Sequence, residues 1–288
     1  MPLGTLLLAM LSFQCGAALA KQLFPLVGAQ GTTAIRLGLG TLLLWLVRWP
    51  WRRLAGREAW ASLWGYGLTL GLMNLCFYMA LRTIPLGIAV ALEFVGPLAI
   101  ALFGSRRTLD FLWVGLVVAA LGLLLPWQAQ AHALDFVGVL YAMGAAAGWA
   151  AYILLGRRAG AVFGGDTVAL GTAIGALVAV PVGVAHAGGA LFSPAALPYA
   201  LGVAVLSSAL PYSLEMYALT RLPARTVGIL MSIEPALGAL LGLALLNEHL
   251  TVLQWLAITA IIAASIGTVL GARKAPVQST EMAEPEPN

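Results

Sequence analysis

Long apolar runs separated by short polar connections make up most of this 288-residue chain. Crossing about 30 Å of hydrocarbon takes roughly 20 helical residues, so each apolar run of that length predicts one membrane-spanning helix. Such windows can be placed at 3–22, 30–47, 61–81, 85–104, 110–127, 136–155, 167–186, 197–217, 226–246 and 251–271. The pattern predicts an all-α integral membrane protein with ten transmembrane helices.

Composition agrees with a membrane location. Hydrophobic residues make up 61% of the chain and charged residues 9%, which excludes an ordinary soluble globular protein. Near the end of the first window, Ala18 and Ala20 precede Lys21 in a pattern that resembles a signal-peptidase site. Because no positively charged segment precedes that window, we expect it to remain as the first span. The lipid bilayer is therefore the expected environment of the whole chain.

Lysines and arginines are divided unevenly between the two sets of connections. Of the 15 basic residues, 12 lie in alternate connections and in the C-terminal tail. Lys21 and Arg82 lie on the opposite side, and Arg36 lies within a span. The positive-inside rule then places both termini in the cytoplasm. The twelve are Arg48, Arg52, Arg53, Arg57, Arg106, Arg107, Arg157, Arg158, Arg221, Arg225, Arg273 and Lys274. They form no single basic face, so no nucleic-acid partner is expected.

The chain contains an internal repeat. A shift of 138 residues aligns 80–104 with 218–242, so that Pro85 and Pro97 coincide with Pro223 and Pro235. We place the first repeat at 3–127 and the second at 136–271, followed by a proline-rich acidic tail at 275–288 that is expected to be disordered. Each repeat has five spans, and because five is odd the second repeat enters the membrane from the opposite side. Inverted repeats with a midplane binding site are typical of secondary transporters.

Three glutamates fall within predicted spans: Glu93, Glu215 and Glu234. A charged group at this depth costs a few kcal/mol on insertion scales, so such residues face protein or water and are candidates for a functional site. Glu93 lies four residues before Pro97, and Glu234 lies one residue before Pro235. The repeat can therefore bring both acids to one cavity from opposite halves, as a substrate-binding or proton-binding site requires.

Three prolines within spans are predicted to interrupt their helices. Each removes the hydrogen bond to the carbonyl four residues earlier. Pro97 frees the carbonyl of Glu93, Pro211 that of Ser207, and Pro235 that of Met231. In the structural alternative, a membrane proline only kinks its helix and a buried glutamate only bonds a neighbouring arginine.

Two cations complete the candidate binding site. Arg36, within the second span, can pair with a glutamate or bind a substrate carboxylate, and Lys21 can do either or extend to the outer interface. Asn74, Tyr78 and Trp149 are predicted to line the cavity, although Trp and Tyr also form ordinary interfacial belts. No hydrolase motif, P-loop or metal-ligand spacing occurs. We therefore expect no enzyme activity, no metal and no cofactor.

Four segments carry a family resemblance: ALAKQLFPLVGA with TAIRLGLGTL, NLCFYMALRTIPLGIAVALEFVGPLAIALFGSRR, LPYSLEMYALTRLPARTVGILMSIEPALGALLG, and IIAASIGT. They are similar to the bacterial inner-membrane threonine/homoserine exporters of the EamA-type branch of the drug/metabolite transporter superfamily. The resemblance covers roughly residues 5–274. It implies ten helices in two inverted EamA repeats, both termini in the cytoplasm, and export of threonine, homoserine and related amino acids by secondary transport.

The candidate residues suit a zwitterion. Glu93 or Glu234 can bind its ammonium group, and Arg36 or Lys21 its carboxylate. Our hypothesis is proton antiport, in which protonation of Glu93 from outside releases the substrate. Sodium is the alternative coupling ion, because freed carbonyls and a carboxylate can coordinate it. Competing hypotheses are a broader metabolite or drug exporter, a non-transporting membrane scaffold or sensor, and, third, an intramembrane enzyme. The sequence predicts no oligomeric state.

Overall fold

The computed structural model describes residues 2–48, 57–103, 108–124, 134–219, 221–222 and 224–271. Within these ranges the chain forms helices joined by turns, and no strand occurs. The predicted tail at 275–288 and Arg52, Arg53, Arg106 and Arg107 lie outside the described residues. The helices are α1 (Pro2–Arg48), α2 (Arg57–Ala80), α3 (Leu86–Phe103), α4 (Thr108–Leu124), α5 (Phe136–Phe163), α6 (Thr167–Ala187), α7 (Leu197–Ala204), α8 (Leu210–Leu219), α9 (Ala224–Met231), α10 (Glu234–Leu246) and α11 (Val252–Gly271).

Several helical stretches have the length and apolar composition of membrane spans. Among the described residues, four such stretches reach at least 18 residues: Pro2–Leu46, Phe136–Phe192, Ile229–Leu246 and Val252–Leu270. The first two contain 45 and 57 residues, more than twice the roughly 20 that one crossing takes. The all-helical class predicted from the apolar windows is therefore confirmed, while the number of crossings and their two-repeat arrangement stay predictions.

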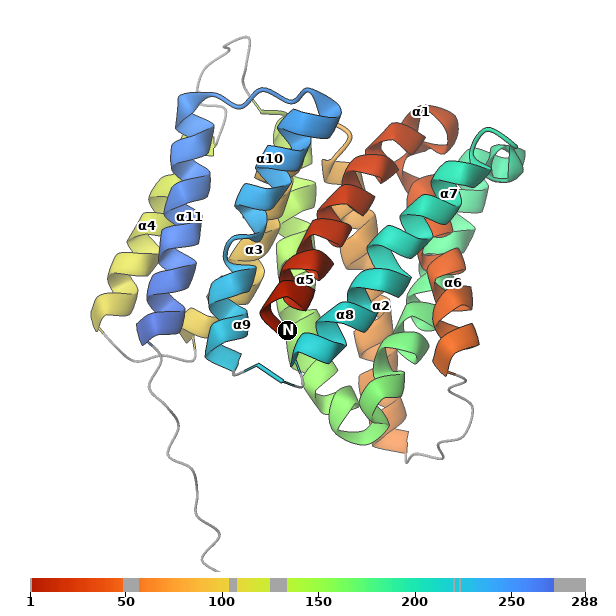
Figure 1. Cartoon of the computed structure of the whole chain (residues 1–288), viewed down its shortest axis with the longest axis horizontal. Helices are drawn as coiled ribbons and strands as arrows, with labels where there is room; N and C mark the ends of the chain where they lie inside the picture. Colours follow the sequence, from red (N-terminus) through yellow and green to blue (C-terminus); the bar gives the residue numbers. More distant parts are fainter. Residues whose placement is uncertain are drawn as a thin grey trace, which may run out of the picture.

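Helix α1 contains two of the predicted windows, 3–22 and 30–47, with a sharp turn between them at Gly28. This residue has φ 69° and ψ 172°, outside the helical region, and only glycine adopts such angles easily. A Cβ atom at Gly28 would also lie 2.7 Å from His186 Nε2. The chain therefore reverses direction at one residue, and the second arm of α1 runs beside α6 (Figure 1).

The three prolines behave differently. Helix α3 continues from Leu86 to Phe103 with Pro97 inside it, so Pro97 does not end its helix, and a bend at Glu93 stays a prediction. A proline removes one hydrogen bond, and the bonds on either side can maintain the helix. In contrast, α10 begins at Glu234 with Pro235 in its first turn, after a break that follows Met231. Pro211 lies in the first turn of α8, directly after the π-helical turn Val205–Ala209.

Helix α3 occupies the centre of the molecule. Leu86, Ile88, Ala89 and Ala91 are fully buried in the main core cluster, and α3 packs against α5 and α10. Close approach depends on small residues, since a Cβ at Gly87 would overlap the backbone of Ala239 in α10. This packing places the second turn of α3, which holds Glu93, deep inside the protein (Figure 1).

Candidate functional site

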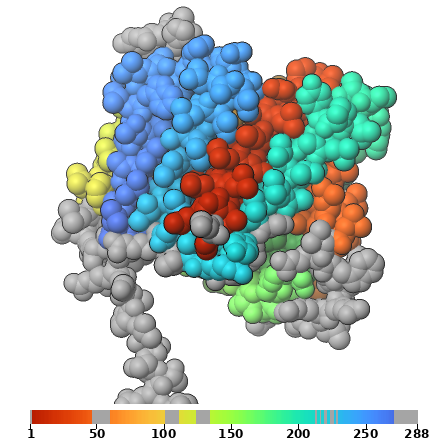
Figure 2. All heavy atoms as spheres, viewed as in Figure 1, coloured from red at the N-terminus to blue at the C-terminus, as the bar shows by residue number. Residues whose placement is uncertain are grey.

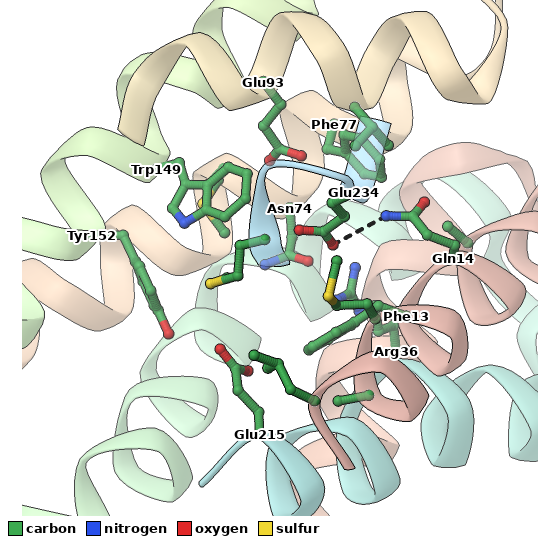
Figure 3. Close-up of a pocket in the computed structure, with 17 residues that line it drawn as sticks. Phe13, Gln14, Arg36, Asn74, Phe77, Glu93, Trp149, Tyr152, Glu215 and Glu234 are labelled. Carbon is green, nitrogen blue, oxygen red and sulfur yellow. Dashed lines mark hydrogen bonds between the residues drawn. The ribbon is translucent and has the colours of Figure 1, made fainter. Parts of the chain in front are cut away.

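A cavity of about 150 Å³ lies between α1, α2, α3, α5, α8 and the break before α10. Its lining combines charged and amide groups with aromatic and apolar side chains (Figure 3). The lining residues are Leu6, Ala9, Met10, Phe13, Gln14, Ala17, Arg36, Met73, Asn74, Phe77, Val90, Glu93, Trp149, Tyr152, Glu215, Met231 and Glu234. Along α1 the cavity therefore extends from Ala17 to Leu6, toward the N-terminus. The first turns of α1 lie on the surface in the space-filling view (Figure 2, red).

The structure brings the three predicted carboxylates together at this cavity. Glu93 comes from the centre of α3, Glu234 from the first turn of α10, and Glu215 from α8. Glu93 and Glu234 are 9% and 8% exposed, and in the close-up all three side chains point into the same space (Figure 3). Residues from both halves of the chain thus form one acidic site, as the repeat predicts.

Glu93 and Glu234 differ in their hydrogen bonding. Gln14 Nε2 donates to Glu234 Oε1 at 3.1 Å, so a residue of α1 holds the carboxylate at the start of α10. Among the described residues no hydrogen-bond donor lies on the Glu93 carboxylate, which faces the cavity (Figure 3). A carboxylate with open acceptor positions in a buried cavity can accept a proton or an ammonium group. Glu93 is therefore the acid best placed to change partners.

Arg36 supplies a guanidinium group to the same cavity. Its Nη1 donates to the Tyr78 hydroxyl at 3.4 Å, and its Nη2 donates to the Ser207 carbonyl at 3.3 Å. The guanidinium carbon also lies 5.4 Å from the centre of the Tyr78 ring, within cation–π range. The sequence predicts that Tyr78 lines the cavity. In the structure it does not line the cavity; it is fully buried and contacts Arg36.

Of the alternatives open for Lys21 in the sequence, the structure shows the pair with a glutamate, at a place outside the cavity. Lys21 does not line the cavity. It lies one helical turn beyond Ala17, where its Nζ forms an ion pair with Glu248 Oε1 at 2.5 Å and donates to the Ile84 carbonyl at 3.1 Å. Substrate binding by Lys21 was inferred from charge alone, and Glu248, which lies just outside a predicted span, gave no signal as its partner.

The structure places two other predicted lining residues at the cavity, together with several that were not predicted. Asn74 and Trp149 line the cavity, and Trp149 packs edge-on against Phe94 with ring centres 5.6 Å apart. Gln14, Phe13 and Phe77 also line it but were not predicted, and Tyr152 lines it although its sequence position favoured an interfacial belt. Gln14 could have been predicted from the sequence, because it is an amide side chain within an apolar run. The aromatic residues gave no signal, because spans contain many of them.

No group of three or more His, Cys, Asp or Glu side chains suited to a metal ion occurs among the described residues. Within that same part of the chain, Cys15 and Cys76 are free thiols. The charged groups of the cavity can exchange protons, form ion pairs and form hydrogen bonds. The lining offers a small polar molecule one guanidinium and six oxygen-bearing side chains: Gln14, Asn74, Glu93, Tyr152, Glu215 and Glu234.

Comparison with known proteins gives concordant results. Residues 136–270 match the EamA-like transporter family. The threonine/homoserine exporter RhtA of Salmonella typhimurium is 56% identical to this chain over 276 residues, which cover 96% of this chain and 94% of that protein. The RhtA protein of Escherichia coli is also 56% identical, over 274 residues, covering 95% and 93%. One solved crystal structure shares the fold with a TM-score of 0.60 at 20% identity, covering 93% of this chain and 97% of that one.

Proposed function

The chain belongs to the EamA-like transporter family, and on that premise we propose that it exports small amino acids such as threonine and homoserine by proton antiport with alternating access. It is an exporter of the bacterial inner membrane rather than an enzyme. The substrate, the coupling ion and the transport cycle are the proposed part, and the RhtA exporters supply the choice of threonine and homoserine.

The observation that supports this proposal is the charge pattern of the cavity. Three carboxylates and one guanidinium line a space of about 150 Å³. A zwitterionic amino acid needs a cation for its carboxylate and an anion for its ammonium group, and charge-assisted hydrogen bonds supply both. Arg36 fits the first role and Glu93 or Glu234 the second. The excess of acids over bases leaves at least one carboxylate available for proton exchange.

The proposed cycle uses Glu93 as the exchanging acid. With both termini in the cytoplasm, as the arginine distribution predicts, the cavity extends toward the cytoplasmic end of α1. Substrate enters there, and its ammonium group binds the ionised Glu93. The two halves then rock, exposing the site to the outside. Protonation of Glu93 releases the ammonium group, and the protonated site returns inward.

The size of the cavity argues against the broader drug exporter. Pockets for drug-sized ligands occupy roughly 300–1,000 Å³ and have mainly apolar walls, whereas this cavity is about 150 Å³ and is lined by three glutamates and one arginine. A scaffold or sensor without flux gives no reason for such a cavity. A panel of labelled threonine, homoserine, larger metabolites and lipophilic cations, tested for efflux, separates these possibilities.

The direct test uses proteoliposomes loaded with labelled threonine, with and without an inward proton gradient. Gradient-stimulated efflux is expected in the unmodified protein and should be lost in Glu93→Gln, which cannot ionise. Asp166→Asn, at the turn between α5 and α6 and outside the cavity, is the matched control and should keep the stimulation. Full gradient-driven efflux by Glu93→Gln would show that Glu93 is not the coupling acid, and stimulation by sodium alone would replace the proton.

A further inference from the structure

The π-helical turn Val205–Ala209 binds Arg36, the cation that lines the cavity. The Leu210 N–H donates to the Val205 carbonyl, five residues earlier, and residue 211 is a proline. An α-helix would supply the N–H of residue 211 to the Ser207 carbonyl, but Pro211 has none. That carbonyl accepts from Arg36 Nη2 instead, at 3.3 Å. A break in the helix thus offers a backbone acceptor to an arginine side chain.

Both arms of α1 close around this turn. From the first arm, Ser12 Oγ donates to the Leu206 carbonyl at 2.8 Å; from the second arm comes Arg36. Glycines make the approach possible, because a Cβ at Gly16 would overlap Ser207 Oγ and one at Gly40 would lie 2.8 Å from Ser208 Oγ. Ser207 is 1% exposed. The turn is therefore fixed in place, and the Ser207 carbonyl is a rigid anchor.

A rigid anchor matters because arginine is a long side chain. Its rotamer freedom is lost whenever it binds a ligand, and prior fixing removes that cost from binding. The Ser207 carbonyl and the Tyr78 hydroxyl together hold two of the guanidinium nitrogens, while the group still lines the cavity. A guanidinium carries its N–H donors in one plane, so anchoring two of its nitrogens fixes the direction in which the group faces the cavity.

We propose that Pro211 is a positioning residue for substrate recognition: through the freed Ser207 carbonyl it holds Arg36 ready for the substrate's carboxylate, and so selects ligands with a free carboxylate over those without one. This inference rests on the proposed function. It gives Pro211, which does not line the cavity, a role in substrate specificity. Arg36 contacts the substrate, and Pro211 acts only through Arg36.

The test compares two ligands on Pro211→Ala, which restores an N–H that competes for the Ser207 carbonyl. Binding to the purified protein is measured by titration calorimetry with threonine and with threonine methyl ester, whose carboxylate is blocked. The dissociation constant for threonine should rise about fivefold, the size expected when one hydrogen bond is lost, and that for the ester should stay the same. Pro181→Ala, at an exposed position of α6, is the matched control and should change neither.

A second variant covers the case in which Pro211→Ala does not fold. Ser12→Ala keeps the proline but releases the turn from the first arm of α1, and it should also weaken threonine binding selectively. In an Arg36→Gln background, Pro211→Ala should have no further effect on either ligand. Equal weakening of threonine and its ester, or no change in either, would overturn the inference while leaving the proposed function intact. If the unmodified protein binds neither threonine nor homoserine, the proposed function fails, and the inference with it.

Discussion

Lys21 and Glu248 form an ion pair that joins residues 227 positions apart in the chain, with Nζ and Oε1 separated by 2.5 Å. The second oxygen of Glu248 accepts the Leu86 N–H at 2.7 Å. Leu86 is the first residue of α3, whose N–H has no partner within the helix, and a negative charge there also interacts favourably with the helix dipole. One carboxylate therefore ties α1 and the α10–α11 connection to the start of α3.

Removing this carboxylate should weaken the fold. Glu248→Ala loses both the ion pair and the cap on α3. A hydrogen bond to a charged group contributes about 1.5–3 kcal/mol to the free energy of unfolding. The side chains of Lys21 and Glu248 are 23% and 13% exposed, so water competes only in part. We expect a lower thermal unfolding temperature in detergent. In a double-mutant cycle, Lys21→Met and Glu248→Gln should be non-additive, and strict additivity would show that the pair is not coupled. Exposed Arg82→Met is the control.

The Gln14 amide should be needed for substrate affinity. Gln14→Leu preserves the approximate size but removes the donor to Glu234 Oε1, so the carboxylate loses its fixed orientation. Loss of one bond to a charged group weakens binding by roughly tenfold. The concentration of threonine that half-saturates efflux should rise by that factor. Gln22→Leu, on the same helix but exposed, should behave like the unmodified protein, and equal effects of the two changes would contradict this role.

Gly87 should tolerate no side chain. A Cβ there would overlap the Ala239 backbone in α10, and overpacking of a rigid interface costs typically 1–3 kcal/mol or more. Gly87→Ala is therefore expected to reduce the monodisperse fraction on size-exclusion chromatography and to lower the unfolding temperature. Gly115→Ala in α4 meets nothing within 4 Å and should fold normally. Normal folding of both variants would mean that α3 and α10 pack less closely.

At low pH, protonation of the Asp135 carboxylate should destabilise the N-terminal end of α5. The Gly138 amide and then the Thr83 hydroxyl bond its carboxylate and hold the pKa of Asp135 below its ordinary value. A lowered folded-state pKa gives stabilisation above the unfolded value of about 3.9, lost as pH falls through the folded value. Asp135→Ala should lower the unfolding temperature at pH 7, by a margin that shrinks below about pH 4. Asp135→Asn, which caps without titrating, should show no such pH dependence.

Much of the fold follows from hydrophobic run length. Helix α6, Thr167–Ala187, begins at the start of its predicted window 167–186 and ends one residue beyond it, because the bilayer sets the length of apolar helices. Irregular backbone is harder to predict. Pro97 leaves α3 continuous, whereas the chain breaks ahead of Pro235. The pattern does not distinguish them, because the outcome depends on which neighbouring groups satisfy the freed carbonyls.

The charged residues of the site could be predicted because charges are rare within apolar spans. Their contacts could not be predicted where the two partners are far apart in the sequence. Glu93, Glu215, Glu234 and Arg36 were found because an ionised group within a span has few uses outside a site. The sequence left Lys21 open between pairing with a glutamate, binding substrate and reaching the interface, because its partner, Glu248, is far away in the chain. The freed Ser207 carbonyl was predicted from Pro211, but sequence spacing could not show that Arg36 would bind it.

The reversal at Gly28 limits how the protein can be labelled. Because the two arms of α1 join through a single residue, that end of the hairpin offers no loop in which to insert an epitope or a protease site. A reporter placed there would separate the arms and with them Ser12 and Arg36. The turn around Phe192, which is 86% exposed, is the better position for a tag that reports on the face opposite the N-terminus.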